Sequence, residues 1–254
     1  MNKFFEKLKK ILFPDDLKCD ICGKEIPSGN KKVVCDRCLK ELPFIFHGCT
    51  KCGEKIEGEY DVCFSCKQNF RDFDRSYSVF EYSGLAKEMV WNLKYENKKY
   101  LAKTMANFLA EKIVFENIKF DTLTCVPTTK HNVKKRGYNQ AQMLASSLAK
   151  LIGAEADFSI LYRVKENSSQ VELSAADRAK NIENSFIVQN KAAVKGKTVL
   201  VVDDVLTTGA TMSECAKMLK RAGANKVIGL TFANTTRKPK FEKENIQIPT
   251  KSEN

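Results

Sequence analysis

The residues best suited to chemistry lie in one short stretch, residues 199–211, which reads VLVVDDVLTTGAT. An apolar run leads into two carboxylates, Asp203 and Asp204, and then into a turn of threonines around Gly209. Amide N–H groups at the start of a helix attract an anion, and glycine lets the backbone approach a phosphate closely. The carboxylates can accept hydrogen bonds from two ribose hydroxyls. The stretch therefore predicts a site for a 5-phosphorylated ribose, with an acidic turn before an ordinary capped helix as the plainer interpretation.

A second group of residues suited to chemistry consists of eight cysteines in four Cys-x-x-Cys pairs. The pairs are Cys19/Cys22, Cys35/Cys38, Cys49/Cys52 and Cys63/Cys66. Each pair places two thiolates on one turn, and two such turns close a tetrahedral site with no open position for chemistry. Pairing in sequence order predicts two structural zinc sites. Iron bound as in rubredoxin, disulfides, buried thiols and pairing across the two repeats remain as alternatives.

Charge is unevenly distributed along the 254 residues, whose formal net charge is +12. Residues 71–254 hold 30 Lys and Arg against 20 Asp and Glu, so most of the excess lies there. Such a surplus fits phosphorylated substrates or nucleic acid, and it equally fits a solvated basic surface.

The elements that must position these groups alternate between apolar strands and amphipathic helices. Strands are expected at residues 78–82, 122–126, 197–202 and 226–233, and helices at 85–93, 100–116, 138–151, 174–184 and 211–222. Strands that are apolar throughout are typical of a parallel sheet covered on both faces. The sequence therefore predicts an α/β fold with a parallel sheet and helices on both faces, preceded by a small zinc-ribbon module.

Four segments divide the chain. Residues 1–13 form an amphipathic helix expected to dock on the rest of the protein, or alternatively to contact a membrane surface. Residues 14–70 are the tandem four-cysteine module, 71–234 the α/β domain, and 235–254 a polar tail expected to be disordered. We expect a cytoplasmic protein, because no signal-peptide core and no membrane-spanning apolar run is present in the sequence.

The stretch VVDDVLTTGAT resembles the signature of type I phosphoribosyltransferases, which bind phosphoribosyl pyrophosphate (PRPP). Beyond this stretch, residues 12–234 resemble the ComF family of bacterial competence proteins. That resemblance rests on the cysteine array, on RGYNQ at residues 136–140 after Val126-Pro127, and on Gln170, Arg178, Asn181 and Phe186. Tyr138 stands where this family would be expected to have phenylalanine, which keeps the aromatic ring.

The resemblance implies a role for each matching residue. Asp203 and Asp204 would hold the ribose diol, and the 5-phosphate would lie on Thr207, Thr208, Gly209, Ala210 and Thr211. The loop after Pro127 would approach the pyrophosphate through Arg136, although a structural salt bridge of Arg136 is an alternative. Lys130, Lys134 and Lys135 would add positive potential there, and Arg178 would belong to a mobile lid between Arg163 and Phe186. Magnesium would bridge the ribose and pyrophosphate oxygens.

Two functions follow from the resemblance. One is PRPP-dependent transfer of a phosphoribosyl group to an unidentified acceptor, with Asp203, Asp204 and Arg136 as the catalytic set. The other is a non-enzymatic protein that handles single-stranded DNA during uptake, together with other DNA-uptake proteins, and keeps the pocket to bind or sense PRPP. A transcriptional regulator is disfavoured, because the sequence contains no recognisable helix-turn-helix.

Overall fold

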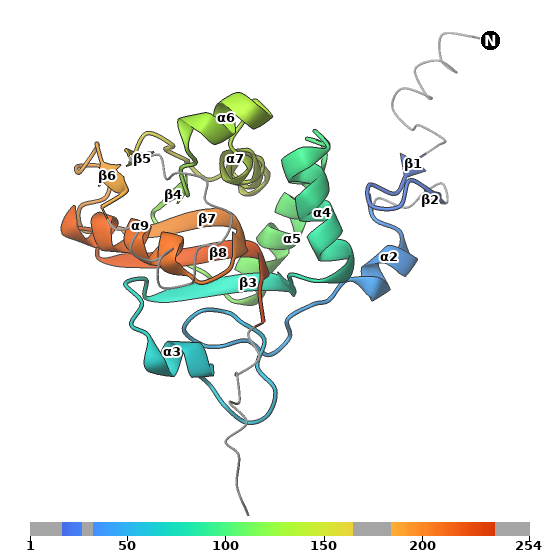
Figure 1. Ribbon diagram of the computed structural model, residues 1–254, viewed down its shortest axis with the longest axis horizontal. Coiled ribbons are helices and arrows are strands. Elements are labelled where there is room, and N and C mark those ends of the chain that lie inside the picture. The colour runs from blue at the N-terminus through green and yellow to red at the C-terminus, as the bar shows by residue number, and fades with distance from the viewer. Residues whose placement is uncertain (1–16, 27–32, 165–183, 237–254) are drawn as a thin grey trace, which may run out of the picture.

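A parallel sheet of four strands forms the centre of the protein (Figure 1). The computed structural model describes residues 17–26, 33–164 and 184–236. In spatial order the strands are β3 (Arg75–Glu81), β8 (Lys226–Asn234), β7 (Thr198–Leu206) and β4 (Thr122–Cys125). Every neighbouring pair is parallel, which confirms the predicted fold class.

Helices cover both faces of this sheet. They are α4 (Gly84–Tyr95), α5 (Leu101–Phe115), α7 (Gln140–Ile152) and α9 (Ala210–Arg221). On β8, Phe232 meets the ring of Phe108 from α5, whereas a Cβ at Gly229 would meet Met212 of α9. Residues 229 and 232 point to opposite faces of a strand, so α5 and α9 lie on opposite sides of the sheet.

The N-terminal module covers the open edge of β3. It contains β1 (Leu17–Lys18), β2 (Glu25–Ile26), α2 (Asp36–Glu41) and α3 (Phe64–Gln68). The Ser76 amide donates to the carbonyl of Lys51 at 2.8 Å, and the Ile45 amide donates to the carbonyl of Val79 at 2.9 Å. A Cβ at Gly53 would lie 2.7 Å from the Ser76 oxygen, so only glycine fits this approach. The module thus forms hydrogen bonds with backbone groups of β3 that would otherwise be unpaired at the edge of the sheet.

Aromatic packing ties the module to the sheet. The ring of Phe44, from the module, lies 4.6 Å from that of Phe80 on β3, centroid to centroid. Phe80 in turn contacts Phe108 on α5 at 5.1 Å and Phe232 on β8 at 4.9 Å. Phe80, Phe108 and Phe232 are buried, so one continuous core joins the module, the sheet and a covering helix.

Two sequence-based expectations are corrected by the structure. The segment after Pro127 is a helix, α6 (Lys130–Arg136), rather than a loop. Thr129 caps it by accepting from the Asn132 amide at 3.1 Å, and Gly137 ends it at a φ of 80°. The apolar strand predicted at residues 197–202 continues to Leu206, because its hydrogen bonding to β8 runs through the acidic pair.

Three expectations fall largely outside the described residues: the helix at residues 1–13, the helix at 174–184 and the tail at 235–254. The boundary near residue 70 stays a prediction. A short antiparallel pair, β5 (Leu161–Arg163) and β6 (Phe186–Val188), flanks the gap at residues 165–183. Among the helices that the structure describes, none is long and apolar enough to cross a membrane.

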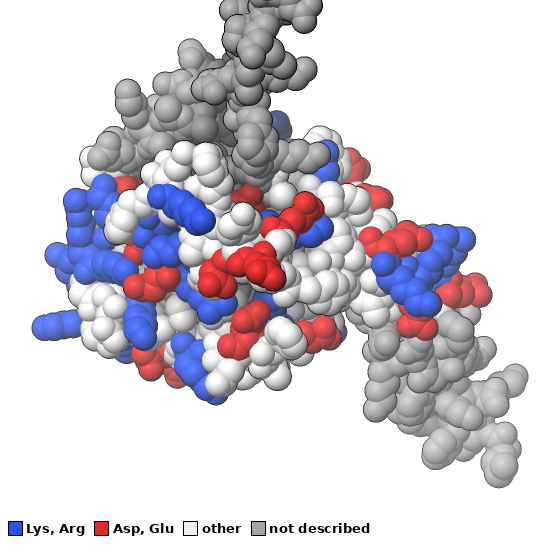
Figure 2. All heavy atoms as spheres, turned by 90° about the horizontal axis from the view of Figure 1, so that it is seen from below, with Lys and Arg blue, Asp and Glu red and all other residues white. Residues whose placement is uncertain are grey.

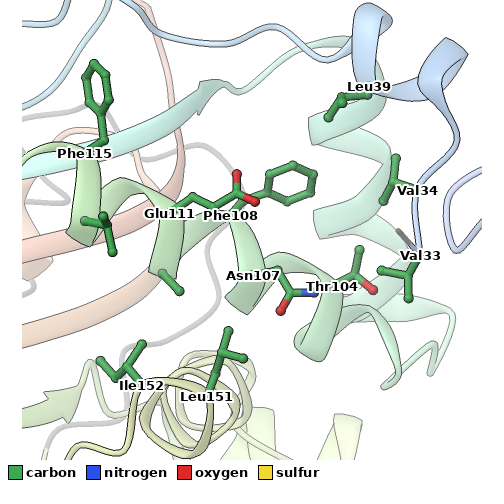
Figure 3. A pocket seen from close by; sticks show the side chains of 12 residues that line it. Val33, Val34, Leu39, Thr104, Asn107, Phe108, Glu111, Phe115, Leu151 and Ile152 are labelled. Carbon is green, nitrogen blue, oxygen red and sulfur yellow. The ribbon is translucent and has the colours of Figure 1, made fainter. Parts of the chain in front are cut away.

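An apolar groove of about 900 Å³ lies between α5, the end of α7 and the part of the module that contains Val33, Val34 and Leu39 (Figure 3). Figure 3 shows Phe108 and Glu111 of α5, Leu151 of α7 and Val34 of the module around it. Within the ranges described, no residue fills it, and Phe115 at its rim is 81% exposed.

Candidate functional site

The acidic pair and the glycine turn lie together at the carboxyl end of β7. The strand passes through Asp203 and Asp204, ends at Leu206, and leads through Thr207 and Thr208 into α9. Gly209 is the N-cap of this helix at a φ of 74°, a conformation that favours glycine, and the Thr208 hydroxyl accepts a hydrogen bond from the Ala210 amide at 3.3 Å. The first turn of α9 therefore presents helix N-terminal amides beside two carboxylates.

One carboxylate of the pair is held by a lysine from another helix. Lys94, in the last turn of α4, places its Nζ 2.8 Å from Oδ1 of Asp204. The Asp204 side chain is 8% exposed and that of Lys94 21%. Burial lowers the pKa of Lys94, but the charges of Asp204 and Asp203 outweigh it and raise that pKa overall. Lys94 is therefore charged, and it is the counter-ion of a nearly buried carboxylate.

The other carboxylate has a different environment. Asp203 keeps part of its surface accessible, and its Oδ1 accepts the Asp204 amide at 2.8 Å. Burial raises the pKa of Asp203 to about 8, and the negative charge of Asp204 adds to the effect, while Lys94 opposes it. Two adjacent carboxyl groups thus lie in different electrostatic environments, Asp204 beside a cation and Asp203 with a raised pKa.

The RGYNQ segment joins α6 to the end of β4. Asn139 caps α7 by accepting from the Ala141 amide at 3.1 Å, and its Nδ2 donates to the Val126 carbonyl at 3.1 Å. The Tyr138 hydroxyl donates to the carbonyl of Leu93 in α4. Gly137 supplies the turn between the two helices. The segment therefore fixes α6 and α4 relative to the strand ends.

Arg136 lies against α4 rather than in an ion pair. Its guanidinium stands 5.1 Å from the centroid of the Tyr95 ring, and Nη2 donates to the Tyr95 hydroxyl at 3.4 Å. Its Nε is buried and has no hydrogen-bond partner among the described residues. The salt-bridge alternative is not seen among these residues. Arg136 is instead held by an aromatic ring, which leaves donor capacity for an anion.

The end of α4 belongs to this site, although its residues were not among those predicted from the sequence. Three consecutive residues contact three parts of the site: Leu93 accepts from Tyr138, Lys94 pairs with Asp204, and Tyr95 contacts Arg136. The available signal was periodicity. Lys94 follows the buried Val90 by four residues, so a charged residue falls on the buried face of a helix.

The other predicted site residues lie at the start of α9 and on α6, apart from Arg178. Thr207 is exposed, while Thr208, Ala210 and Thr211 are half-buried around the turn. Lys130 is exposed at the first residue of α6, and Lys134 and Lys135 are exposed in its last turn. Arg178 lies outside the described residues.

The eight cysteines form two groups, each from one sequence repeat. Within each group all four sulfurs lie within 4.8 Å of one another. The Cys22–Cys35 and Cys52–Cys63 sulfurs are 3.8 Å and 3.7 Å apart. A tetrahedron with zinc–sulfur bonds of about 2.3 Å has edges of about 3.8 Å, so the groups fit zinc. All are free thiols, which excludes the disulfide alternative, and crossed pairing is also wrong.

Hydrogen bonds prepare the second group for a cation. The amides of Lys51, Cys52 and Cys63 donate to the Cys49 sulfur at 3.4, 3.5 and 3.3 Å. Hydrogen bonds from the neighbouring thiols, with Cys52 first, lower the pKa of Cys49. Amides directed at a thiolate are the expected surroundings of a metal-bound cysteine.

Comparison with known proteins agrees with this geometry. The family model described as phosphoribosyl transferase domain matches residues 96–252, and the chain belongs to that family. The DNA utilization protein YhgH of Salmonella typhimurium is 29% identical over 196 residues, which cover 75% of this chain and 86% of that protein. Competence protein F of Haemophilus influenzae is 27% identical over 203 residues, covering 78% and 88%. With its two four-cysteine groups, the chain is a member of the ComF family.

One solved structure illustrates how distant the structural similarity is. The allosteric regulatory enzyme of purine biosynthesis matches 52% of this chain and 26% of its own, at a TM-score of 0.36 and 22% identity.

Lys94→Ala should destabilise the protein by about 3 kcal/mol, because it leaves the Asp204 carboxylate without its counter-ion in a nearly buried position. The matched control is Lys55→Ala, which removes the more exposed pair with Glu81 (38% and 23% exposed) and should cost about 1 kcal/mol or less. Urea unfolding at pH 7 measures both values. Equal losses of unfolding free energy in the two variants would show that the Lys94–Asp204 pair stabilises the protein no more than the exposed Lys55–Glu81 pair does.

The free energy of unfolding should fall as the pH rises from about 4 to about 8, because folded Asp203 retains a proton that an unfolded Asp, with a pKa of about 3.9, has released. Asp203→Asn should make this slope shallower, since asparagine does not titrate. Urea unfolding at pH 5, 6, 7 and 8 gives the difference between wild type and variant. A difference that is constant with pH would refute the raised pKa.

Proposed function

We propose that this protein binds PRPP with magnesium at the carboxyl end of β7 and transfers its phosphoribosyl group to an acceptor. The observation that carries the proposal is the juxtaposition of Asp203 and Asp204 with the start of α9, whose N-cap is Gly209. In this assignment the two carboxylates accept hydrogen bonds from the ribose 2- and 3-hydroxyls. Residues 207–211 hold the 5-phosphate with their amides and hydroxyls.

The cations around this pair would act on the pyrophosphate end of the ligand. Arg136 keeps a buried Nε without a described partner and is oriented by Tyr95, so it is the best candidate for a pyrophosphate contact. Lys130 lies on the same helix, α6, and would add positive potential. Arg178 is outside the described residues, and its role as a lid residue stays a prediction.

The reaction would proceed by loss of pyrophosphate from the anomeric carbon as the acceptor attacks. Positive charge develops on the ribose ring in such a transition state, so the protein acts by positioning groups and by electrostatic stabilisation. Lys94 pairs with Asp204, and the partly accessible Asp203 would face a ribose hydroxyl. Magnesium, held by oxygen ligands, would neutralise the pyrophosphate charge as it leaves.

The two four-cysteine groups are proposed to hold zinc as structural centres. All four sulfurs of each group are used in closing the tetrahedron, so neither group has an open position for substrate. Residues 14–70 would then be a zinc-ribbon module whose fold depends on metal, since it is too short to bury a large core.

A second candidate function is the handling of single-stranded DNA during uptake. The observation that favours it is the pair of relatives named as a competence protein and as a DNA utilization protein. Figure 2 shows Lys and Arg side chains gathered on one side of the face that carries the N-terminal module. A basic surface of this kind fits a phosphate backbone. In that case the phosphoribosyl site would bind or sense PRPP without turnover.

Replacing both carboxylates, Asp203→Ala with Asp204→Ala, should abolish PRPP binding measured by calorimetry with magnesium, because the ribose diol loses both acceptors. Asp121→Asn is the matched control, since Asp121 lies at the opposite end of β7, where its Oδ2 accepts the Thr198 amide. The control should bind as wild type does. Heats of binding that are the same in the double variant and in the wild type would remove the site assignment.

Binding of a fluorescent oligothymidine, together with pyrophosphate release from PRPP, separates the two functions. A transferase should release pyrophosphate, and Asp204→Asn should lose that release while any DNA binding is retained. A DNA-handling protein should bind the oligonucleotide with an affinity that falls steeply with salt, because counterions are released. Strong DNA binding with no pyrophosphate release under any condition would favour the second function over the first.

A further inference from the structure

We propose that the second four-cysteine group is part of the phosphoribose site, because its surrounding residues hold the phosphate loop at residues 207–209 in its binding conformation. Metal loading of this group would then set the affinity for a 5-phosphorylated ribose. The inference rests on the proposed function and adds that the N-terminal module regulates it.

The loop lies directly on the module. A space of only about 10 Å³ separates them, at the size limit for a single water molecule. Its lining combines the module, through Cys52, Glu54 and Ser65, with the loop residues Thr207, Thr208 and Gly209. Arg71 and Asn234 complete this lining. Two segments some 150 residues apart in sequence thus share one packed interface.

Arg71 is the cation of this interface. A Cβ added at Gly209 would lie 3.5 Å from Nε and 3.6 Å from Cζ of Arg71, so the guanidinium packs against the glycine of the phosphate loop. Its Nη2 donates to Ser65 Oγ at 3.3 Å, and Ser65 lies between the ligands Cys63 and Cys66. Its Nε is buried without a hydrogen-bond partner in the described structure. Arg71 therefore places positive charge under a loop proposed to bind a phosphate.

Asn234 links the module to the same loop from the strand side. It is 2% exposed, and its Nδ2 donates to the Cys52 carbonyl at 2.9 Å and to Ser78 Oγ at 3.1 Å. Asn234 is the last residue of β8 and pairs with Leu206, where β7 enters the loop. The next residue, Thr235, donates its amide to the Leu206 carbonyl at 3.1 Å and its hydroxyl to the Thr207 carbonyl at 3.3 Å.

The segment that follows the module, residues 71–73, also anchors α9. Ser213, in the first turn of this helix, donates its hydroxyl to Asp72 Oδ2 at 2.7 Å and accepts the Asp72 amide at 2.9 Å. Phe73 is fully buried beneath Gly209. The loop and the helix start are thus held from below by three consecutive residues, Arg71, Asp72 and Phe73.

The first four-cysteine group makes a natural control, because it lies elsewhere. Its Asp20 accepts hydrogen bonds from Thr104 and Tyr100, at the start of α5. Among the described residues, no hydrogen bond joins this group to residues 203–211. Both groups have the same ligands, and only the second touches the phosphate loop, so metal loss at each should affect PRPP binding differently.

Arg71→Met removes the guanidinium that packs against Gly209 and leaves the eight cysteines unchanged. Methionine keeps most of the apolar volume and removes the charge, so binding of PRPP with magnesium should weaken by about tenfold or more, the range of one charge-assisted interaction. Ribose 5-phosphate should weaken to the same extent, whereas inorganic pyrophosphate, which lacks the 5-phosphate, should not. Arg37→Met, on the exposed surface of α2, is the matched control. Zinc content by mass spectrometry and the melting temperature should not change in either variant.

The full-length double variants Cys63→Ser/Cys66→Ser and Cys35→Ser/Cys38→Ser test the metal dependence. Each should lose one zinc per chain, but only the first should bind PRPP about tenfold or more weakly. Equal PRPP affinity in the two double variants, or an Arg71→Met variant that binds as wild type does, would overturn this inference alone. Wild-type protein that binds no PRPP would overturn the proposed function as well, so the two failures are distinguishable.

Discussion

The architecture of this protein depends on the placing of two adjacent carboxylates near the end of a central parallel strand. Asp203 and Asp204 lie on β7, between β4 and β8, where Asp204 is buried and Asp203 is half-buried. A carboxylate in such a place needs a counter-ion or a proton. The protein uses both: Asp204 pairs with Lys94, and Asp203 has a raised pKa. The position of α4 follows from this requirement, because its last turn must deliver the lysine.

The same end of α4 joins the two parts of the proposed site. Tyr95 orients Arg136, while Leu93 accepts a hydrogen bond from Tyr138. The acidic pair and the α6 segment, which are far apart in sequence, therefore share one support. Packed helices hold side chains in more narrowly defined positions than free loops do. Electrostatic stabilisation of a transition state depends on such pre-organised groups.

The N-terminal module packs directly against the α/β domain. It covers the edge of β3, contributes Phe44 to the aromatic core, and lies against residues 207–209 through Cys52, Glu54 and Ser65. This integration brings together the cysteine array and the phosphoribosyl transferase domain of the chain. Two relatives are named as a DNA utilization protein and as a competence protein. The contacts between the module and the α/β domain give a physical route by which a change in one can affect the other.

Features that are recorded in local patterns could be predicted from the amino-acid sequence. Apolar strands indicated the parallel sheet, the spacing of Cys19–Cys66 indicated two four-sulfur groups, and VVDDVLTTGAT indicated the strand, turn and helix start. The distant residues that complete these features became known from the folded chain. Lys94 and Asp204 are 110 residues apart, and the contact of Arg71 with Gly209 spans more than half of the chain. Such pairings arise from the packing of whole elements, and a single sequence carries no local period or spacing that records them.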